Sequence, residues 1–385
     1  MSINSKSTSY FAKADSINVS VIIPVYNNQI FIYDCLQSVI NQSLKNIEII
    51  CVNDGSTDLT LSILNDFSKK DSRIIVLNQN NNGPGFSRNR AARIAKGKYL
   101  YFMDSDDTID VDCLERLFLV SEKFNSDICL VGVNAYDEIN KSYVPYLNFS
   151  TKKYKKDTLI KKKDLHGELF FKFAPFFLFY KKEFFINNKL CFNEKYLLGE
   201  DVLCSLRAKI ESNIFAVCNA DLYHYRINTT SSITSNINNK KIDDLFSYFI
   251  DMHNYLVNKN LWSNYKKYYF DYILDAIKSY LPVSNKKYIY TKIVQFNSEL
   301  RKSENEVHFS TDLNKISSEL NNLSKYSYLY VKTKNIKNFC DISYTLSKSY
   351  VKIRILGKTI FVIHNTRYFF ILRLFGIRLV KYSKY

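Results

Sequence analysis

The chain has 385 residues, of which 46% are hydrophobic, and a mean hydropathy of −0.21. It is long enough to bury a core in two or three domains, and it has no apolar run of the length that spans a membrane. Its 54 Lys and Arg against 37 Asp and Glu give a net charge of +17, which calls for an anionic partner. The eight cysteines show no zinc-binding spacing, so reduced thiols in a cytoplasmic protein are expected.

The positive charge is concentrated at the C-terminus. Residues 331–385 contain twelve Lys and Arg but a single acid, Asp341, so this segment carries more than half of the net charge. Such a segment favours contact with the anionic face of a membrane. It can also pack on the rest of the protein with its charges in solvent, and both interpretations stay open.

Apolar runs alternate with amphipathic segments from residue 18 to about 135. Strands are expected at 19–27, 47–52, 74–77, 98–103 and 127–133, and helices at 29–42, around 61–67, at 87–96 and at 111–124. This alternation predicts βαβ units, a mostly parallel central sheet and therefore an α/β fold.

The regular alternation ends after about residue 135. A helix is expected at 198–211, and aromatic residues recur at helical spacing from 241 to 323. Residues 351–360 and 371–379 form a weak repeat in which apolar and basic residues alternate around one Gly, as in short hairpins. The expected parts are a flexible N-terminus (1–17), an α/β domain (18–235), an α-helical region (236–330) and a small basic β-rich segment (331–385).

Three carboxylates follow the expected strand at 98–103: Asp104, Asp106 and Asp107. Because alternate residues of an extended chain project from one face, Asp104 and Asp106 can converge on one ligand. Open α/β sheets bind ligands beyond the carboxyl ends of their strands. Capping of the next helix would need only one Asp, so the cluster favours a site for a divalent cation and a diphosphate.

Three further motifs each have a structural and a functional interpretation. Residues 53–58 form a turn and a helix cap, or they place Asp54 to accept the imino N–H of a uracil. Residues 82–85, before Arg88, form a turn or the surroundings of a phosphate. Glu200 and Asp201 precede an apolar helix, where the helix dipole favours acids.

Taken together, these segments resemble a family 2 glycosyltransferase of the GT-A fold. The matching pieces are 21–27, 52–58, 88–89 with 95–99, 104–107 and 199–201, in the order of the family across about 17–230. The resemblance implies a nucleotide-sugar-binding fold with a mostly parallel central sheet. It also implies inverting transfer from a nucleotide-diphospho-sugar, most often UDP-linked, with Mn²⁺ or Mg²⁺.

The resemblance assigns roles to single residues. The expected contacts of the donor nucleotide are Pro24, Tyr26, Asn27, Asp54, Arg88, Asp104 and Ser105. Asp106 would ligate the metal, with His224 as a further candidate, although a lone His is more often structural. Asp201 would be the general base, and Glu200, Asp107 and Arg226 would lie beside these groups. The start of the following helix is expected to favour the ionised form of Asp201 at neutral pH.

The expected acceptor is a hydroxyl of a cell-surface glycan or glycolipid, such as lipooligosaccharide or capsule, at the cytoplasmic face of an inner membrane. One alternative is transfer to a polyprenyl phosphate. Another is a non-catalytic basic module that binds membrane or nucleic acid on a degenerate nucleotide fold. The carboxylates argue against that module and no RNA-binding signature occurs, so no nucleic-acid partner is expected.

Overall fold

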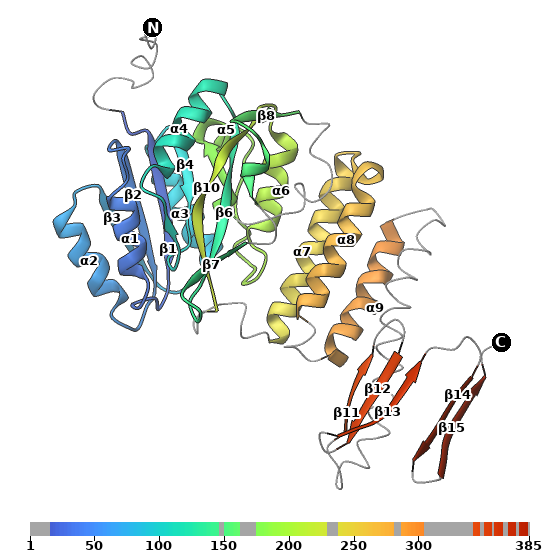
Figure 1. The fold of residues 1–385 in the computed structure, drawn as a ribbon. Helices are drawn as coiled ribbons and strands as arrows, with labels where there is room; N and C mark the ends of the chain where they lie inside the picture. The colour runs from blue at the N-terminus through green and yellow to red at the C-terminus, as the bar shows by residue number, and fades with distance from the viewer. Residues whose placement is uncertain are drawn as a thin grey trace. The chain divides into compact units, whose positions relative to one another are not determined.

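The computed structural model describes residues 16–145, 150–161, 175–228, 238–280 and 286–303, and five strands between 342 and 383 (Figure 1). The chain divides into two compact units, Met1–Asn305 and Glu306–Tyr385. Residues 1–15 of the expected N-terminus and 304–323 of the expected helical region lie outside the described residues.

A ten-stranded sheet, counted over the described residues, is the centre of the first unit. Its main path has the order β3-β2-β1-β4-β9-β6-β10-β5, and β7 pairs with β6 and β8 with β10. The strands are β1 Val19–Val25, β2 Ile47–Asp54, β3 Ile74–Gln79, β4 Tyr99–Phe102, β5 Thr108–Ile109, β6 Ile128–Asp137, β7 Ser142–Pro145, β8 Thr158–Ile160, β9 Leu178–Lys181 and β10 Phe215–Ile227.

The centre of the sheet is mostly parallel, as the sequence predicts. Strands β3, β2, β1 and β4 are parallel neighbours, and so are β6 and β10. Strand β9 is inserted between β4 and β6 and is antiparallel to both. The chain runs outward from β1 to β3 and then returns to place β4 on the other side of β1. Such a reversal of strand order marks the place where open α/β sheets bind ligands.

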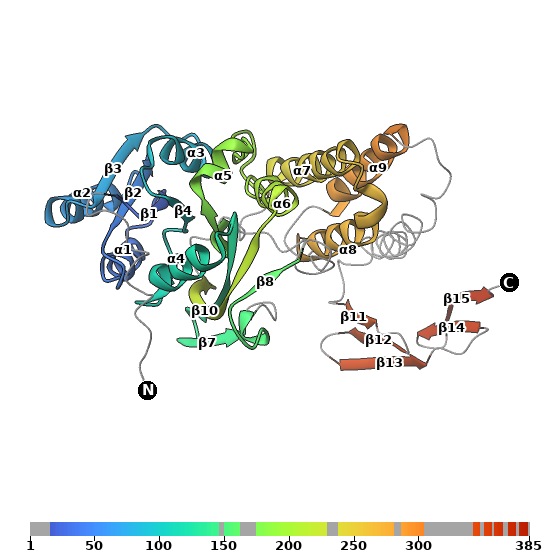
Figure 2. The same ribbon diagram turned by 90° about the horizontal axis from the view of Figure 1, so that it is seen from above.

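Helices cover both faces of this sheet. They are α1 Ile32–Ile40, α2 Thr60–Lys70, α3 Pro84–Ile94, α4 Cys113–Phe124, α5 Lys182–Asn187 and α6 Val202–Glu211. In Figure 2, α1 and α4 lie on one side of the sheet, and α3, α5 and α6 lie on the other. Helix α3 begins earlier than the sequence predicts because Pro84 is preset for the first helical turn and Gly83, at φ +88°, ends the preceding loop.

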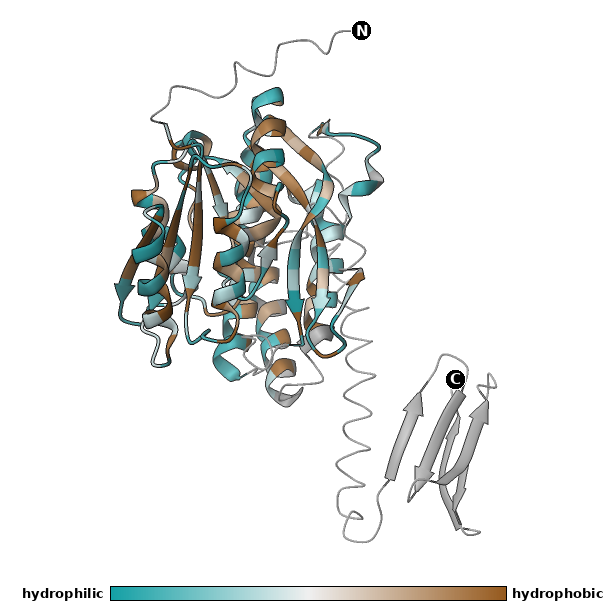
Figure 3. Cartoon of the chain, turned by 60° about the vertical axis from the view of Figure 1, so that its left-hand side comes forward, coloured by the Kyte–Doolittle hydropathy of each residue, from teal (hydrophilic) through white to brown (hydrophobic). Residues whose placement is uncertain are grey.

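Burial on both faces explains the continuous apolar runs of the central strands. Every residue of β2 is buried, and so are all residues of β4. In Figure 3 many residues along the strands of the sheet have the hydrophobic colours. Aromatic rings extend the core onto neighbouring elements, since Tyr99 stacks on Phe179 with centroids 4.9 Å apart and meets Phe118 edge-on.

Three helices follow the sheet in the same compact unit: α7 Asn239–Asn258, α8 Trp262–Tyr280 and α9 Lys286–Ser303. Aromatic residues join them, as in the edge-on contacts of Phe246 in α7 with Phe296 in α9 and of Phe249 in α7 with Tyr272 in α8. The helical region is therefore confirmed over the described residues. The domain boundaries expected at 235/236 and 330/331 stay predictions.

The second unit contains a three-stranded antiparallel sheet and a separate strand pair. The three-stranded sheet comprises β11 Ile342–Leu346, β12 Tyr350–Ile355 and β13 Lys358–His364. The strand pair comprises β14 Phe369–Leu374 and β15 Ile377–Ser383. Each copy of the expected repeat forms an antiparallel pair, β12 with β13 and β14 with β15. Over the part of the chain that the structure describes, no helix is both long and apolar enough to cross a membrane.

Candidate active site

Two consecutive asparagines after β1 join its carboxyl end to the segments that follow β2 and β4. Asn27, at φ +46°, accepts a hydrogen bond from the Thr57 amide at 2.7 Å and so ties the end of β1 to the loop after β2. Asn28 Nδ2 donates to Ser105 Oγ at 2.8 Å, beyond β4. Pro24 is partly exposed and Tyr26 is 51% exposed at this edge. A ring in this position can stack on a ligand.

Asp54 organises the loop that leads into α3. Its carboxylate is buried and accepts hydrogen bonds from the amides of Asn82 and Gly83, both at 2.8 Å, and from Gln79 Nε2 at 2.7 Å. A carboxylate offers about four lone-pair sites. The uracil contact expected of Asp54 would therefore use the remaining one, and the carboxylate already has a structural role.

Arg88 connects the end of β4 to the loop before α6. Its guanidinium donates to Asp104 Oδ1 and to Glu200 Oε1, each at 2.7 Å, and its side chain is only 5% exposed. The guanidinium also lies over the Phe192 ring, 5.3 Å from the centroid. Arg88 thus neutralises the charges of two carboxylates. If Asp104 contacts the ribose of a donor, as the sequence predicts, it does so while paired with Arg88.

Asp201 is the residue before α6, but its side chain forms no capping hydrogen bond. Burial, followed by the charge of Glu200, raises the pKa of Asp201 to about 7, and Arg88 opposes this rise. Burial and Glu200 thus act against the expected effect of the helix start, which was to favour the ionised form of Asp201 at neutral pH. A half-buried carboxylate with this pKa is suited to accept a proton near neutral pH.

The other two carboxylates after β4 have different surroundings. Asp107 is fully buried and accepts hydrogen bonds from the Tyr223 hydroxyl and, at 2.7 Å, from the Arg226 amide. Asp106 is partly exposed, and burial followed by the charge of Asp104 raises its pKa to about 6. Among the described residues, none donates a side-chain hydrogen bond to the Asp106 carboxylate. Asp106 is therefore the carboxylate of this cluster that remains available to a ligand.

Arg226 fixes the backbone of this loop. Its Nε donates to the Asp106 carbonyl oxygen at 2.8 Å, and its Nη1 pairs with Glu138 at 2.5 Å. The guanidinium lies over the Phe31 ring, 4.6 Å from the centroid. With these partners Arg226 holds the backbone at Asp106, and its expected role near a metal or diphosphate stays a prediction.

The donor set around Asp106 is consistent with a divalent cation that binds together with a diphosphate. His224 Nε2 lies 2.8 Å from Asp110 Oδ1, and its buried Nδ1 has no hydrogen-bond partner within the described ranges. Over those same residues, no group of three or more His, Cys, Asp or Glu could hold a metal by itself. Mg²⁺ sites of phosphate enzymes typically use one or two carboxylates and complete the shell with water and substrate phosphates. The metal role of His224 stays a prediction.

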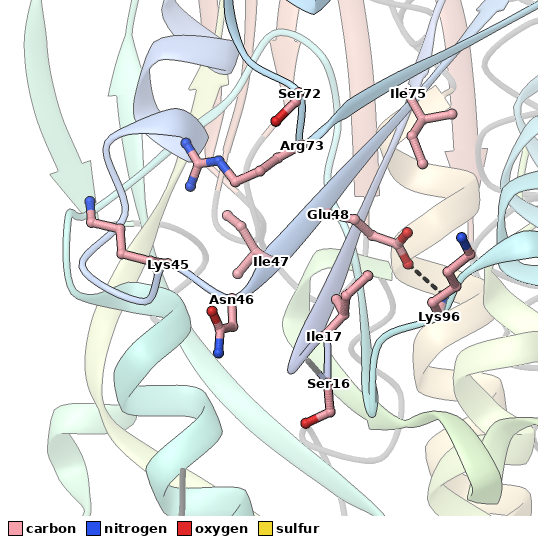
Figure 4. Close-up of a pocket in the computed structure, with 10 residues that line it drawn as sticks. All are labelled: Ser16, Ile17, Lys45, Asn46, Ile47, Glu48, Ser72, Arg73, Ile75 and Lys96. Atoms are coloured by element: carbon pink, nitrogen blue, oxygen red, sulfur yellow. Dashed lines mark hydrogen bonds between the residues drawn. The ribbon is translucent and has the colours of Figure 1, made fainter. Parts of the chain in front are cut away.

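A separate pocket of about 400 Å³ lies at the amino ends of the strands (Figure 4). Its lining includes Lys45, Glu48, Arg73 and Lys96. Arg73 binds Asp71 at 2.6 Å, and Glu48 accepts from Ser20 Oγ and from the Lys96 amide. It is at the edge of the sheet opposite the carboxylates, so it is distinct from the candidate active site.

Several residues of the site carry no local signal in the sequence. Asn28, Gln79, Glu138 and Tyr223 hold the predicted residues in place, but their partners are 25 to 119 residues away in the chain. Asn28 and Tyr223 adjoin the predicted residues Asn27 and His224 in the sequence, whereas Gln79 and Glu138 adjoin none.

The strand order, the carboxylates at its reversal and the half-buried Asp201 define an α/β domain of the GT-A class. Residues 20–185 match the sequence model described as glycosyl transferase family 2. The chain is 34% identical over 214 residues to the uncharacterized glycosyltransferase EpsJ of Bacillus subtilis, covering 55% of this chain and 62% of the relative. It is also 34% identical to a poly(ribitol-phosphate) beta-glucosyltransferase of Bacillus spizizenii, of which it spans 32%, with 55% of this chain covered.

Solved structures share this fold. The crystal structure of Staphylococcus aureus TarS superposes with a TM-score of 0.59 at 19% identity, over 89% of this chain and 60% of that chain. The structure of TarS 1-349 in complex with UDP-GlcNAc gives a TM-score of 0.55 at 18% identity, over 89% of this chain and 98% of that chain. These structures confirm the GT-A fold expected from the sequence, and residues 20–185 match the glycosyl transferase family 2 model.

Proposed function

We propose that this chain is an inverting glycosyltransferase that moves a sugar from a UDP-sugar to an acceptor hydroxyl. The observation that carries the proposal is the Asp201 carboxylate, which is half buried, makes no capping bond and adjoins the cluster of Arg88, Asp104 and Glu200. The structural likeness to TarS in complex with UDP-GlcNAc makes that sugar nucleotide the first donor to test.

The reaction needs one base and one face of attack. The acceptor oxygen forms a bond to the anomeric carbon while the bond from that carbon to the diphosphate oxygen breaks, and UDP leaves with the electron pair. The anomeric carbon becomes oxocarbenium-like, so attack opposite the leaving group inverts its configuration. Asp201 accepts the hydroxyl proton, and its raised pKa supplies the basicity that this transfer needs at neutral pH.

A divalent cation is proposed for the donor diphosphate. Asp106 would hold Mn²⁺ or Mg²⁺, which when bound would neutralise charge on the leaving UDP as a Lewis acid. Two residues hold the loop that carries Asp106. Arg226 donates a hydrogen bond to the Asp106 carbonyl oxygen, and the Tyr223 hydroxyl donates one to the Asp107 carboxylate. That leaves the Asp106 carboxylate free of side-chain hydrogen bonds from the described residues.

The proposed acceptor is a hydroxyl of a cell-surface glycan or glycolipid, such as lipooligosaccharide or capsule. The relative named as a poly(ribitol-phosphate) transferase adds hydroxyls of polyol-phosphate polymers to the acceptors worth testing. The charge of residues 331–385 supports contact with an anionic membrane surface, where each Lys or Arg contributes about 1 kcal/mol. The fraction of the protein that sediments with anionic vesicles should therefore fall steeply as salt is added, and the protein should not sediment with neutral vesicles.

The donor class can be tested by thermal unfolding with UDP, GDP or CMP, each with Mn²⁺ or with EDTA. A ligand at about one hundred times its Kd stabilises the folded state by roughly 2.7 kcal/mol, which is a visible shift. We expect a shift with UDP and Mn²⁺ that EDTA removes and that Asp106→Ala lacks. A shift with another nucleotide, or none, would contradict the proposed donor.

The product assay then separates the proposal from its alternatives. Incubation with UDP-GlcNAc and a panel of glycan, polyol-phosphate and polyprenyl-phosphate acceptors should yield a glycoside of inverted configuration at a hydroxyl. Transfer only to polyprenyl phosphate would indicate the carrier-lipid reaction instead. Salt-dependent binding to arbitrary RNA, with no response to a UDP-sugar, would indicate a non-catalytic module.

A further inference from the structure

One face of α7 contacts the loop that carries the proposed base. Asp244, Tyr248 and Asp251 lie at positions i, i+4 and i+7 of this helix, so they project from the same side. The segment opposite them is 196–199, immediately before Glu200 and Asp201. Helix α7 lies outside residues 20–185, the segment that matches the family.

Two hydrogen bonds and one close approach join α7 to this segment. Asp244 Oδ2 accepts from the Leu197 amide at 2.8 Å, and Asp251 Oδ2 accepts from the Tyr196 hydroxyl at 2.8 Å. A Cβ added to Gly199 would lie 2.2 Å from the Tyr248 ring. Gly199 is at φ +79°, where other residues are strained. These contacts therefore restrict where residues 196–199 can lie against α7.

The α7 side of these contacts is buried, since Asp244 is 1% exposed and Tyr248 is 3% exposed. The hydrogen bond between Asp244 and the Leu197 amide is partly buried. Removing the acceptor at Asp244 would leave that amide without its protein partner in a partly desolvated place, a loss that is costlier than that of a fully exposed hydrogen bond. Lys240, at 2.6 Å from Asp244, balances the carboxylate charge.

The same loop is also held by α3. Arg88 of α3 binds Glu200 Oε1, and within the connecting segment the Asn193 amide donates to the Glu200 carbonyl oxygen at 2.9 Å. The loop before α6 thus has contacts with α3 and with α7. Asp201 directly follows this segment in the chain. A change in the position of α7 would therefore also move the Asp201 carboxylate.

We infer that α7 is part of the catalytic apparatus, with Asp244, Tyr248 and Asp251 as positioning residues that set the place of the Asp201 carboxylate. This inference rests on the proposed function, because it assigns Asp201 the role of base. It gives the helical region a task beyond packing. A misplacement of about 1 Å in such a group can lower a rate about a hundredfold.

The chain offers a matched pair of hydroxyl deletions. Tyr196→Phe removes the hydrogen bond between the base loop and Asp251 of α7. Tyr255→Phe removes the hydrogen bond between the same helix and Glu211, at the far end of α6. Both variants lose one tyrosine–carboxylate contact of α7, but only the first loosens the base loop.

Steady-state kinetics of the full-length variants with a UDP-sugar provide the main test. We expect Tyr196→Phe to lower kcat several-fold and Asp244→Ala to lower it roughly tenfold to a hundredfold, with KM for the UDP-sugar within about twofold. Asp244→Asn, which keeps an oxygen acceptor, should lose less. Equal effects of Tyr196→Phe and Tyr255→Phe, or equal effects of the two Asp244 variants, would overturn the inference.

Hydrogen exchange separates this inference from the proposed function. In Asp244→Ala the amides of 196–201 should exchange faster than in the wild type, whereas the core strands should keep their protection. Unchanged exchange at Leu197 would overturn the inference even if the enzyme were active. Faster exchange in a protein without transferase activity would keep the positioning role of α7 and reject the proposed function alone.

Discussion

The guanidinium of Arg88 donates to the Glu200 carboxylate, Nη1 to Oε1, at 2.7 Å across 112 residues of sequence. Its other terminal nitrogen binds Asp104 at the same distance. One buried cation therefore couples the carboxylate after β4 to the loop that carries Asp201. The carboxylate proposed to contact the donor, Asp104, and the residue next to the proposed base, Glu200, therefore share one cation.

Loss of the base should separate catalysis from donor binding. We expect Asp201→Asn to reduce transfer by about a thousandfold, within the roughly 10² to 10⁴ range of general-base effects, while the UDP-induced shift in unfolding temperature survives. Asp66→Asn, an exposed acid-to-amide change on α2, is the matched control and should leave kcat unchanged. Substantial transfer by Asp201→Asn would remove this residue from the mechanism.

The pH profile should follow the ionisation of Asp201. Since a general base works in its ionised form, kcat should fall about tenfold for each pH unit below the pKa of about 7 and level off above it. Glu200→Gln removes the neighbouring charge that raises this pKa, so the acid limb should move to lower pH. A kcat that is independent of pH from about 5 to 9 would contradict the assignment.

Removal of the Arg88 side chain should destabilise the fold. In Arg88→Met two carboxylates lose their partner in the interior, and we expect the free energy of unfolding to fall by about 3–5 kcal/mol. Arg93→Met breaks an exposed ion pair of the same helix, with Glu194 at 3.2 Å, and should cost about 0–1 kcal/mol. Urea denaturation of both variants measures the difference. Equal losses would mean that Asp104 and Glu200 do not depend on Arg88.

The hydroxyl of Tyr223 should matter for stability because it donates to a buried carboxylate. Tyr223→Phe leaves the fully buried Asp107 with fewer donors, and we expect a loss of about 1–3 kcal/mol in the free energy of unfolding. The exposed Tyr143 offers the control substitution Tyr143→Phe, which should change stability by less than about 0.5 kcal/mol. If Tyr223→Phe were equally neutral, Asp107 would have to be satisfied by other groups.

Local pattern was sufficient for the elements of the sheet. The apolar runs of β1, β2 and β4 identify buried strands because both faces of a parallel sheet are covered. The same pattern put Asp54 and Asp104 at carboxyl ends, and parallel pairing brings those ends to one edge. It gave no sign of the antiparallel insertion of β9, because strand neighbours are chosen by packing between distant segments.

The sequence by itself therefore determined the α/β class, the family resemblance and the positions of the acidic motifs, all of which depend on residues close together in the chain. The tertiary structure decided what those residues touch: Arg88 joins Asp104 to Glu200, and α7 fixes the base loop. It also supplied two influences that oppose the expected ionisation of Asp201, namely burial and the charge of Glu200. A helix dipole contributes about 0.3–1 kcal/mol, which burial and the charge of Glu200 outweigh, and neither can be read from a local motif.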